Sequence, residues 1–336
     1  MHIFNKHPFL IAEIGITYWN VAQKMNIGAI DAAKLIIDEA KSCGADAVKF
    51  YSPESFDLSF YLPSSQCRFE DFSVEEYREL SNYCKDKNIL FLSTPHDFNS
   101  VDYLDEFMDI YMIPSSDLTN IPFIKHVLTK DKPIIISTGA STLKEIKDAV
   151  DFIEKESTVD LAIMHSVLSC PVSYEDSNLL MIKDLIENFP NYEIGYSDYT
   201  VPDKKMFVLT SAFNLGASIL EKPFTLDKSL NFAMNKCAMD ADDVKIFNEN
   251  IEFLSIINGK KNKQPLICES SARKELRKSI VASKNISKGD ELTKDNLTYK
   301  KPGTGIVPSE IEQIVGKIAI VDILKGSIID FEMFEK

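Results

Sequence analysis

The sequence predicts an α/β protein: a (β/α)₈ TIM barrel of parallel strands alternating with helices, followed by a small β-rich domain. A short apolar run ends in polar residues and a helical stretch follows, and this unit recurs eight times by residue 223. Continuous apolar runs are typical of parallel strands covered on both faces, and eight such units over about 250 residues are typical of a closed barrel. The expected strands are residues 10–15, 47–50, 90–94, 110–115, 133–138, 161–167, 193–198 and 217–223.

Helical signals fill the gaps between these strands. Residues 31–42 carry apolar side chains at helical spacing, and Gly44 follows as a stop signal. The segments 73–76 and 142–145 each match the capping box that begins a helix. Residues 204–215 read as a helix ended by Gly216, and residues 242–257 as a long amphipathic helix that closes the barrel.

A polar, basic segment at residues 259–265 is the best candidate for a linker. Beyond about residue 277 the texture changes to short β-type runs separated by turns, with strands expected at 279–283, 297–300 and 317–321. The predicted organisation is therefore a barrel over residues 1–258, a linker over 259–276 and a β-rich domain over 277–336.

Composition restricts the class of protein. A hydrophobic content of 45% and a charged content of 26% are ordinary for a globular enzyme. The net charge of −14 argues against a nucleic-acid partner, and an anionic ligand would have to be captured by local lysines and helix N-termini. No apolar stretch approaches the roughly 20 residues of a membrane span, and the N-terminus lacks the layout of a signal peptide, so a cytoplasmic protein is expected.

The cysteines are scattered and include no C-x-x-C pair, which argues against a zinc cluster or a disulfide framework and favours reduced thiols. The six are Cys43, Cys67, Cys84, Cys170, Cys237 and Cys268.

Residues at the carboxyl ends of the expected strands are candidates for function, because barrel chemistry lies there. Lys49 ends an otherwise apolar strand and is expected to point into the barrel mouth, because burial of an unpaired ammonium is costly. Glu13 is either a base or hydrogen-bond acceptor for a substrate or the partner of Lys49, and these interpretations are compatible. The strand-end candidates are Glu13, Lys49, Thr94, His96, Ser115, Ser137, Ser197, Asp198, Glu221 and Lys222.

Several of these candidates keep two interpretations. The segment 137–142, with hydroxyls at the start of a helix, is either an anion cradle or a capped turn without a ligand. Glu221 and Lys222 form either an internal ion pair or part of a catalytic site. His96 and His165 show no metal-ligand spacing, and a lone histidine is more often a hydrogen-bonded structural residue.

A series of stretches matches the motifs of one known family, in order along nearly the whole chain. In the barrel they are IAEIG (11–15), AKSCGADAVKF (40–50), FLSTP (91–95), SSDLTN (115–120), KPIIISTGASTLKEI (132–146), IGYSD (194–198) and GASILEKPFTLD (216–227). In the tail they are 278–297, 300–306 and 315–329. The chain thus resembles the sialic acid (N-acetylneuraminate) synthases and the related synthases for legionaminic and pseudaminic acids. The tail resembles their antifreeze-like (SAF) domain.

The resemblance implies an activity and a set of site residues. Such enzymes condense phosphoenolpyruvate with an N-acetylated hexosamine-type sugar in surface glycan biosynthesis. The matching positions imply that Glu13 and Glu221 are catalytic carboxylates on the sugar side of the site. Substrate-binding roles are implied for Lys49, Thr94, Ser115, Ser137, Ser197, Asp198 and Lys301. The resemblance also implies a homodimer in which the SAF domain of one subunit caps the barrel of the other.

The chain departs from the family pattern within this pocket. Tyr199 and Pro223 stand where the family has the two histidines that hold a divalent manganese or magnesium ion, and neither replaces a histidine ligand well. No metal is therefore expected at that site. Met112 and Leu168 replace a lysine and an asparagine, and Lys301 replaces the SAF arginine and lacks its planar fork. Further differences fall at residues 17–18 and 234–235.

Two hypotheses remain open. The first is an enzyme of this class, a carbon–carbon bond-forming transferase that works without the family metal, as the retained lysine, serines and glutamates suggest. The second is a catalytically impaired paralogue that acts as a binding or partner protein, as the lost histidines suggest. The sequence favours the enzyme and does not specify the acceptor sugar.

Overall fold

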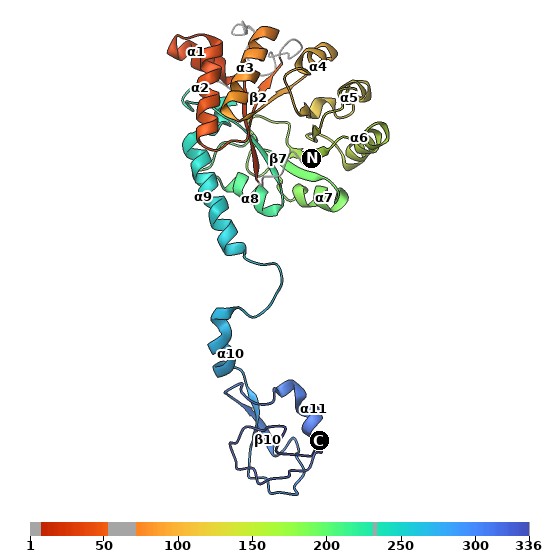
Figure 1. Ribbon diagram of the computed structural model, residues 1–336, viewed down its shortest axis with the longest axis vertical. Helices are drawn as coiled ribbons and strands as arrows, with labels where there is room; N and C mark the ends of the chain where they lie inside the picture. Colours follow the sequence, from red (N-terminus) through yellow and green to blue (C-terminus); the bar gives the residue numbers. More distant parts are fainter. Residues whose placement is uncertain (1–7, 53–71, 231–233, 336) are drawn as a thin grey trace. The chain divides into compact units, whose positions relative to one another are not determined.

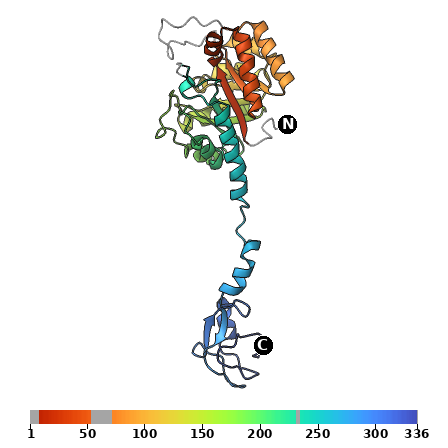
Figure 2. The same ribbon diagram turned by 90° about the vertical axis from the view of Figure 1, so that its left-hand side faces the viewer.

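The computed structural model describes residues 8–52, 72–230 and 234–335, and Cys67 lies outside these ranges. The chain forms two compact units, Met1–Ile257 and Asn258–Lys336, and each is considered by itself. In the first unit the helices are arranged around the strands, as Figures 1 and 2 show. No helix in the described part of the chain is long and apolar enough to cross a membrane.

All eight predicted strands are present in the first unit, and they form one parallel sheet curled into a nearly closed barrel. Their hydrogen-bonded order is β3-β2-β1-β8-β7-β6-β5-β4, so pairing of β1 with β8 joins the first and the last of these eight strands. The bounds are β1 Phe9–Gly15, β2 Ala47–Tyr51, β3 Leu90–Thr94, β4 Tyr111–Ile113, β5 Ile134–Ser137, β6 Leu161–Ser166, β7 Glu193–Ser197 and β8 Ile219–Pro223.

Strands β3 and β4 lie next to each other without a ladder of hydrogen bonds between these two described strands. The backbone N–H of Ser93 in β3 instead points to Sδ of Met108, at 3.1 Å. Strand β4 is also shorter than the predicted 110–115, because Pro114 has no N–H to donate and Ser115–Asp117 turn into a short 3-10 helix, η3. We call this boundary between β3 and β4 the seam.

The helices begin where the sequence offers side-chain caps. Ser73 and Thr142 form the predicted capping boxes with Glu76 and Glu145. The predicted helices at 31–42, 204–215 and 242–257 are observed as α2, α8 and α9, with ends shifted by up to three residues. The bounds are α1 Thr17–Met25, α2 Ala29–Ser42, α3 Val74–Lys87, α4 Phe98–Leu104, α5 Ile121–Leu128, α6 Leu143–Glu156, α7 Met181–Asn188, α8 Phe207–Leu215, η4 Met234–Lys236 and α9 Ala241–Asn258.

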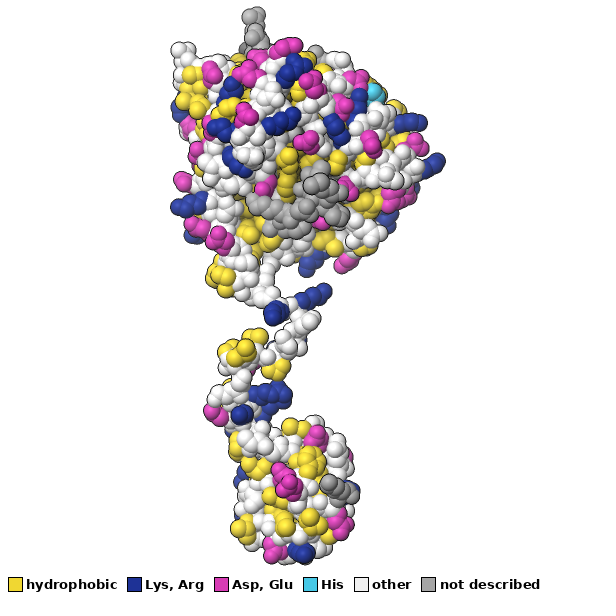
Figure 3. All heavy atoms as spheres, in the orientation of Figure 1, with side chains coloured by type: hydrophobic (Ala, Val, Ile, Leu, Met, Phe, Trp, Pro, Cys, Tyr) yellow, Lys and Arg dark blue, Asp and Glu magenta, His cyan; other side chains and the backbone are white. Residues whose placement is uncertain are grey.

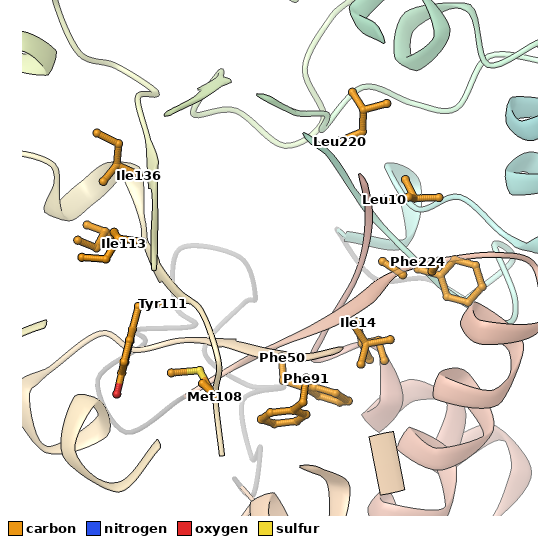
Figure 4. Packing of buried hydrophobic residues seen from close by; sticks show 14 of the residues in the cluster. Leu10, Ile14, Phe50, Phe91, Met108, Tyr111, Ile113, Ile136, Leu220 and Phe224 are labelled. Atoms are coloured by element: carbon orange, nitrogen blue, oxygen red, sulfur yellow. The ribbon is translucent and has the colours of Figure 1, made fainter. Parts of the chain in front are cut away.

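Alternation along the strands separates two buried layers. Side chains such as Leu10, Ile14 and Phe50 belong to the larger hydrophobic cluster, which lies between strands and helices. Figure 4 shows part of this cluster, in which the rings of Phe50 and Phe91 stack at 5.5 Å. Each such side chain stabilises the fold by about 1.5–3 kcal/mol on burial. The residues between them, such as Ile11, belong to a second cluster that fills the barrel interior.

The second unit has its own core of buried apolar side chains, among them Ile280, Leu292 and Ile329. Its sheet is antiparallel and pairs β9 (Ser279–Ala282) with β10 (Leu297–Lys300). The third predicted strand, 317–321, is wrong as a strand: Ile318 and Ala319 make only isolated bridges, to Glu291 and Phe334. The helical elements are η5 Ile267–Glu269, α10 Ser270–Leu276, η6 Pro308–Glu310 and α11 Ile311–Ile314. Two of them, η5 and α10, fall within the predicted linker.

Candidate functional site

The inward register brings polar side chains together at the carboxyl ends of neighbouring strands. Glu13 continues the inward series of Phe9 and Ile11 along β1, and it pairs in register with Lys49 of β2. On the other side, Ser197 of β7 pairs in register with Glu221 of β8. Because β1 also pairs with β8, these four residues come from adjacent strands and face the same interior.

Lys49 lies between two carboxylates. Its Nζ is 2.7 Å from Oε1 of Glu13 and 2.9 Å from Oε2 of Glu221, and all three side chains are almost fully buried. Ser197 Oγ donates to Oε1 of Glu221 at 2.7 Å. We call Glu13, Lys49 and Glu221 the charge array. If every group is ionised, the array has a net negative charge, because two carboxylates face one ammonium.

The environment of the array shifts the pKa values of its members. Burial lowers the pKa of Lys49, but the charges of Glu13 and Glu221 outweigh burial and raise it above the usual lysine value. Burial raises the pKa of Glu221, and repulsion from Glu13 adds to this effect while Lys49 opposes it. The ammonium is therefore retained, and Glu221 takes up a proton more readily than an ordinary glutamate.

Two tyrosines complete the surroundings of Glu13, and the sequence analysis did not identify the first of them. Tyr51 donates its hydroxyl to Oε1 of Glu13 at 2.6 Å, and Tyr199 donates to the same oxygen at 3.0 Å. Burial, strengthened by the charge of Glu13, raises both tyrosine pKa values well above their usual value, so the hydroxyls stay protonated. Tyr51 follows Lys49 by two positions in the same strand, so both side chains face the same side of the sheet. This spacing could have identified Tyr51 from the sequence.

Asp198 and Lys222 form a separate ion pair. Lys222 Nζ lies 2.8 Å from Oδ2 of Asp198 and donates to the carbonyl of Thr200 at 2.7 Å. Lys222 pairs in register with Ala12, which belongs to the cluster between strands and helices. The structure therefore pairs Lys222 with Asp198 instead of Glu221, and it does not bring Asp198 into the charge array.

Hydroxyl groups gather at the ends of β4, β5 and β6. The Oγ atoms of Ser115 and Ser166 are 3.1 Å apart, and the backbone N–H of Gly139 donates to Ser115 Oγ at 2.9 Å. A Cβ on Gly139 would lie 2.9 Å from both hydroxyls, so a larger residue would force Ser115 and Ser166 to shift. Ser137 and Thr94 are buried as well, and Thr94 Oγ1 has no hydrogen-bond partner among the residues described.

The turn before α6 is capped by its own side chains. The N–H of Glu145 donates to Thr142 Oγ1 at 3.3 Å, and the N–H of Thr142 donates to Glu145 Oε2 at 2.7 Å. Of the two interpretations of segment 137–142, the capped turn accounts for these groups, and the N–H of Gly139 is already taken by Ser115.

A cavity of about 490 Å³ opens beside the hydroxyl of Ser166, between the β5–α6 and β6–α7 connections. It is lined by Thr138, Ser141, His165, Ser166, Asn178 and Met181, among others. It shares Ser166 with the pair Ser115 and Ser166, which we call the serine cluster, and its lining also includes apolar side chains such as Leu143 and Ile146.

Burial favours the neutral form of both candidate histidines. His165 Nε2 lies 2.9 Å from the carbonyl oxygen of Ser177, and its ring stacks on Tyr196 at 5.5 Å. Burial lowers the pKa of His165, and burial also lowers the pKa of His96 to about 4. The rings of His96 and Tyr51 meet edge to face, with 6.2 Å between their centroids.

The residues at the family's metal position do not fit a divalent ion. Pro223 offers no side-chain donor, and it pairs in register with Glu13. The Tyr199 hydroxyl is protonated and already donates to Glu13. Within the described ranges, no group of three or more His, Cys, Asp or Glu side chains is arranged to hold a metal ion.

The other departures lie against the site or apart from it. Met112 accepts a contact from Lys49 Nζ at 3.6 Å, so a thioether stands where the resemblance leads one to expect a second lysine. Thr17 and Tyr18 begin α1 and serve packing: Thr17 Oγ1 donates to the carbonyl of Phe224 at 3.1 Å, and Tyr18 is buried. Lys301 belongs to the second unit, where it is exposed next to Pro302.

Family models match both units. The NeuB family model matches residues 63–263, and the SAF domain model matches residues 277–335. An uncharacterised protein of Methanocaldococcus jannaschii is 36% identical over 92% of this chain and 89% of its own length. The N,N'-diacetyllegionaminic acid synthase of Legionella pneumophila is 32% identical over 97% of this chain and 94% of its own length.

A solved structure has the same fold. The N-acetylneuraminic acid synthetase of Leptospira borgpetersenii serovar Hardjo-bovis, in complex with citrate, is 26% identical. It superposes with a TM-score of 0.68 and covers 80% of this chain and 90% of that one.

Proposed function

Since this chain belongs to the NeuB family and ends in a SAF domain, we propose that it is a phosphoenolpyruvate-dependent nonulosonate synthase. Its acceptor would be an N-acetylated hexosamine-type sugar, and its product would enter surface glycan biosynthesis. The observation that carries this proposal is the charge array, in which one buried lysine joins two carboxylates on adjacent strand ends. Relatives that share this fold include enzymes named as synthases of legionaminic and neuraminic acids.

The reaction joins two carbon skeletons and releases phosphate. The C3 carbon of phosphoenolpyruvate attacks the aldehyde carbon of the sugar, water adds at C2, and the phosphate then leaves. In our proposal, Lys49 binds the anionic end of phosphoenolpyruvate together with the hydroxyls of Thr94, Ser115, Ser137 and Ser197. All of these donors except the partly exposed Ser115 are buried, and hydrogen bonds to an anion are stronger in a buried site than in water.

The two carboxylates serve the sugar side of the site. Glu221 has a raised pKa, so it is suited to exchange a proton with the aldehyde oxygen or with the attacking water. Glu13 is held in one orientation by two tyrosine hydroxyls. We propose that Tyr199, a partly exposed neutral donor, turns its hydroxyl from Glu13 to the aldehyde oxygen where the family resemblance places a metal ion, so that the reaction is metal-independent.

Assembly is a further part of the proposal. The family resemblance implies a homodimer in which the SAF domain of one subunit, with Lys301, caps the barrel of another. Light scattering at micromolar concentration should therefore report a dimer, and a monomer would contradict this part.

A catalytically impaired paralogue is the competing function. It is favoured by Met112 and Leu168, which replace polar groups by apolar ones beside the array and the serine cluster. Such a protein would still bind an anion without turning it over.

The deciding experiment is phosphate release from phosphoenolpyruvate with a panel of N-acetylated hexoses, with and without manganese. We expect release with at least one sugar, unchanged by a chelator and abolished in Lys49→Met. The matched control is Lys144→Met, a lysine exposed on α6, which should keep full activity. Calorimetric binding of phosphoenolpyruvate without turnover would support the paralogue, and turnover that requires manganese would contradict metal independence.

A further inference from the structure

Two cysteines from distant parts of the sequence meet beside the barrel mouth. The Sγ atoms of Cys170 and Cys237 are 3.3 Å apart, within hydrogen-bond distance for thiols. Both lie in the described part of the chain, and neither is used by the proposed mechanism. A disulfide requires the two sulfurs to approach to about 2.05 Å, so an approach of little more than 1 Å would bring them to bonding distance.

The two connections that carry these cysteines border the site. Cys170 lies between β6 and α7, and two residues later the N–H of Val172 donates to the carbonyl of Tyr199 at 2.9 Å. Cys237 lies between β8 and α9, and two residues later the N–H of Met239 donates to the carbonyl of Pro223 at 2.8 Å. A bond between the cysteines would therefore tie together the two connections that hold Tyr199 and Pro223.

The two thiols differ in reactivity. The hydrogen bond with Cys237 lowers the pKa of Cys170, and the charge of Lys222 acts in the same direction while burial opposes both. The same hydrogen bond and burial raise the pKa of Cys237. Cys170 is partly exposed, whereas Cys237 is buried. A partly exposed thiol with a lowered pKa beside a second thiol is the arrangement of an attacking and a resolving cysteine.

We propose that Cys170 and Cys237 form a redox-active dithiol that a hydroperoxide converts into a disulfide across the two connections. The Cys170 thiolate attacks one oxygen of hydrogen peroxide, the O–O bond breaks, and the leaving hydroxide takes up the thiol proton as water. The Cys170 sulfenic acid is then attacked by Cys237 Sγ, and a second water leaves as the S–S bond forms. Two thiols are oxidised and one peroxide is reduced to two waters.

The test is peptide mapping of the full-length protein after brief exposure to hydrogen peroxide. Trypsin places Cys170 in the peptide 156–183 and Cys237 in the peptide 237–245, with one cysteine in each. We expect a cross-link between these two peptides, a loss of two hydrogen masses from the intact chain, and full reversal by dithiothreitol.

Single variants separate the two roles. In Cys237→Ser, Cys170 should accumulate as a sulfenic acid that a dione reagent traps, whereas in Cys170→Ser, Cys237 should stay a thiol. Cys43 is the matched control, because it is also partly exposed but its pKa is raised to about 11, chiefly by burial. Cross-links to other cysteines, the absence of any cross-link, or oxidation of Cys43 as fast as Cys170 would each overturn the proposal. None of these readouts depends on synthase activity.

Discussion

At the scale of single residues, Lys49 determines the balance of charge inside the barrel. It lies between two carboxylates that are buried, so water does not screen their charges. Breaking a buried pair by removing one partner costs about 3–5 kcal/mol, because an uncompensated charge is left behind. Removing the positive charge of Lys49 is therefore expected to destabilise the fold strongly.

Replacing Lys49 with methionine should lower the free energy of unfolding by about 3–5 kcal/mol near neutral pH. The loss should be smaller in acid. The pKa of Glu221 is already raised in the folded state, and removal of Lys49 raises it further, so protonation of Glu221 favours folding of the variant. The stabilisation that comes from protonating Glu221 is fully present below the usual pKa of glutamate. It disappears as the pH rises through the pKa of Glu221 in the folded variant.

Urea unfolding at pH 5 and at pH 7.5 measures this difference. Lys144→Met, at a lysine whose side chain is 81% exposed, controls for the loss of a charge, and its effect should be within about 0.5 kcal/mol. An equal penalty for Lys49→Met at both pH values would contradict the assignment.

Much of this residue-scale arrangement follows from the sequence, because a charged residue that ends an apolar strand must find a partner. The sequence allowed Glu13 to be a base or hydrogen-bond acceptor for a substrate or the partner of Lys49, and the structure pairs the two side chains. Glu221 and Lys222 could not be resolved in the same way, since adjacent residues of a strand face opposite sides and each finds its own partner. Tyr51 was missed because a tyrosine at a strand end also fits ordinary packing.

At the scale of elements, the helices depend on local caps and the strands on close packing. The capping box of α6 satisfies backbone groups that would otherwise lack partners. Strand β7 depends on Gly195, where a Cβ would collide with Met164 and lie 2.7 Å from the carbonyl oxygen of Ile219. The sequence predicts the caps directly, whereas it does not predict the close approach at Gly195, which depends on neighbouring strands.

Thr142→Ala should lower the free energy of unfolding by about 1 kcal/mol, because it removes the hydroxyl that accepts from the N–H of Glu145. Thermal or urea unfolding measures the change. Lys144→Ala, two residues along the same helix and without a role in the cap, should change stability by less than about 0.5 kcal/mol. Equal effects of the two variants would contradict the role of the cap.

Gly195→Ala should destabilise the barrel by about 1–3 kcal/mol or more, because the added methyl group overpacks the interior. Gly28→Ala is the matched control, since the nearest atom to its Cβ, Oδ2 of Asp31, lies at an ordinary 3.4 Å. The comparison is made by urea unfolding, and a tolerated Gly195→Ala would show that Met164 and β8 can move aside.

At the scale of the whole molecule, the chain consists of two units with separate hydrophobic cores. Acidic and basic side chains are interspersed over the face of the first unit in Figure 3. The two family models divide the chain at nearly the same place, since one ends at residue 263 and the other begins at residue 277. The short helices between them were not predicted, because a segment with little buried surface gives only weak periodicity.

Limited digestion with trypsin should first cut the connection between the units. Lys260, Lys261 and Lys263 are exposed and lie outside helices and strands, so they can enter a protease active site without unfolding of either core. Mass spectrometry should show one fragment that ends, and a second that begins, within residues 260–264. Persistence of the intact connection while cuts appear inside α2 or α6 would contradict this expectation.

The seam between β3 and β4 makes the barrel a curled sheet with two edges. Thr94 lies on one edge and Ser115 follows the other, and in our proposal both contact the same anion. A bound anion would then connect the edges by side-chain hydrogen bonds where the backbone ladder is missing, so that ligand binding and closure of the sheet become one event. Amide hydrogen exchange of β3 and β4 should slow when phosphoenolpyruvate is added, while exchange in the fully paired β6 should change little.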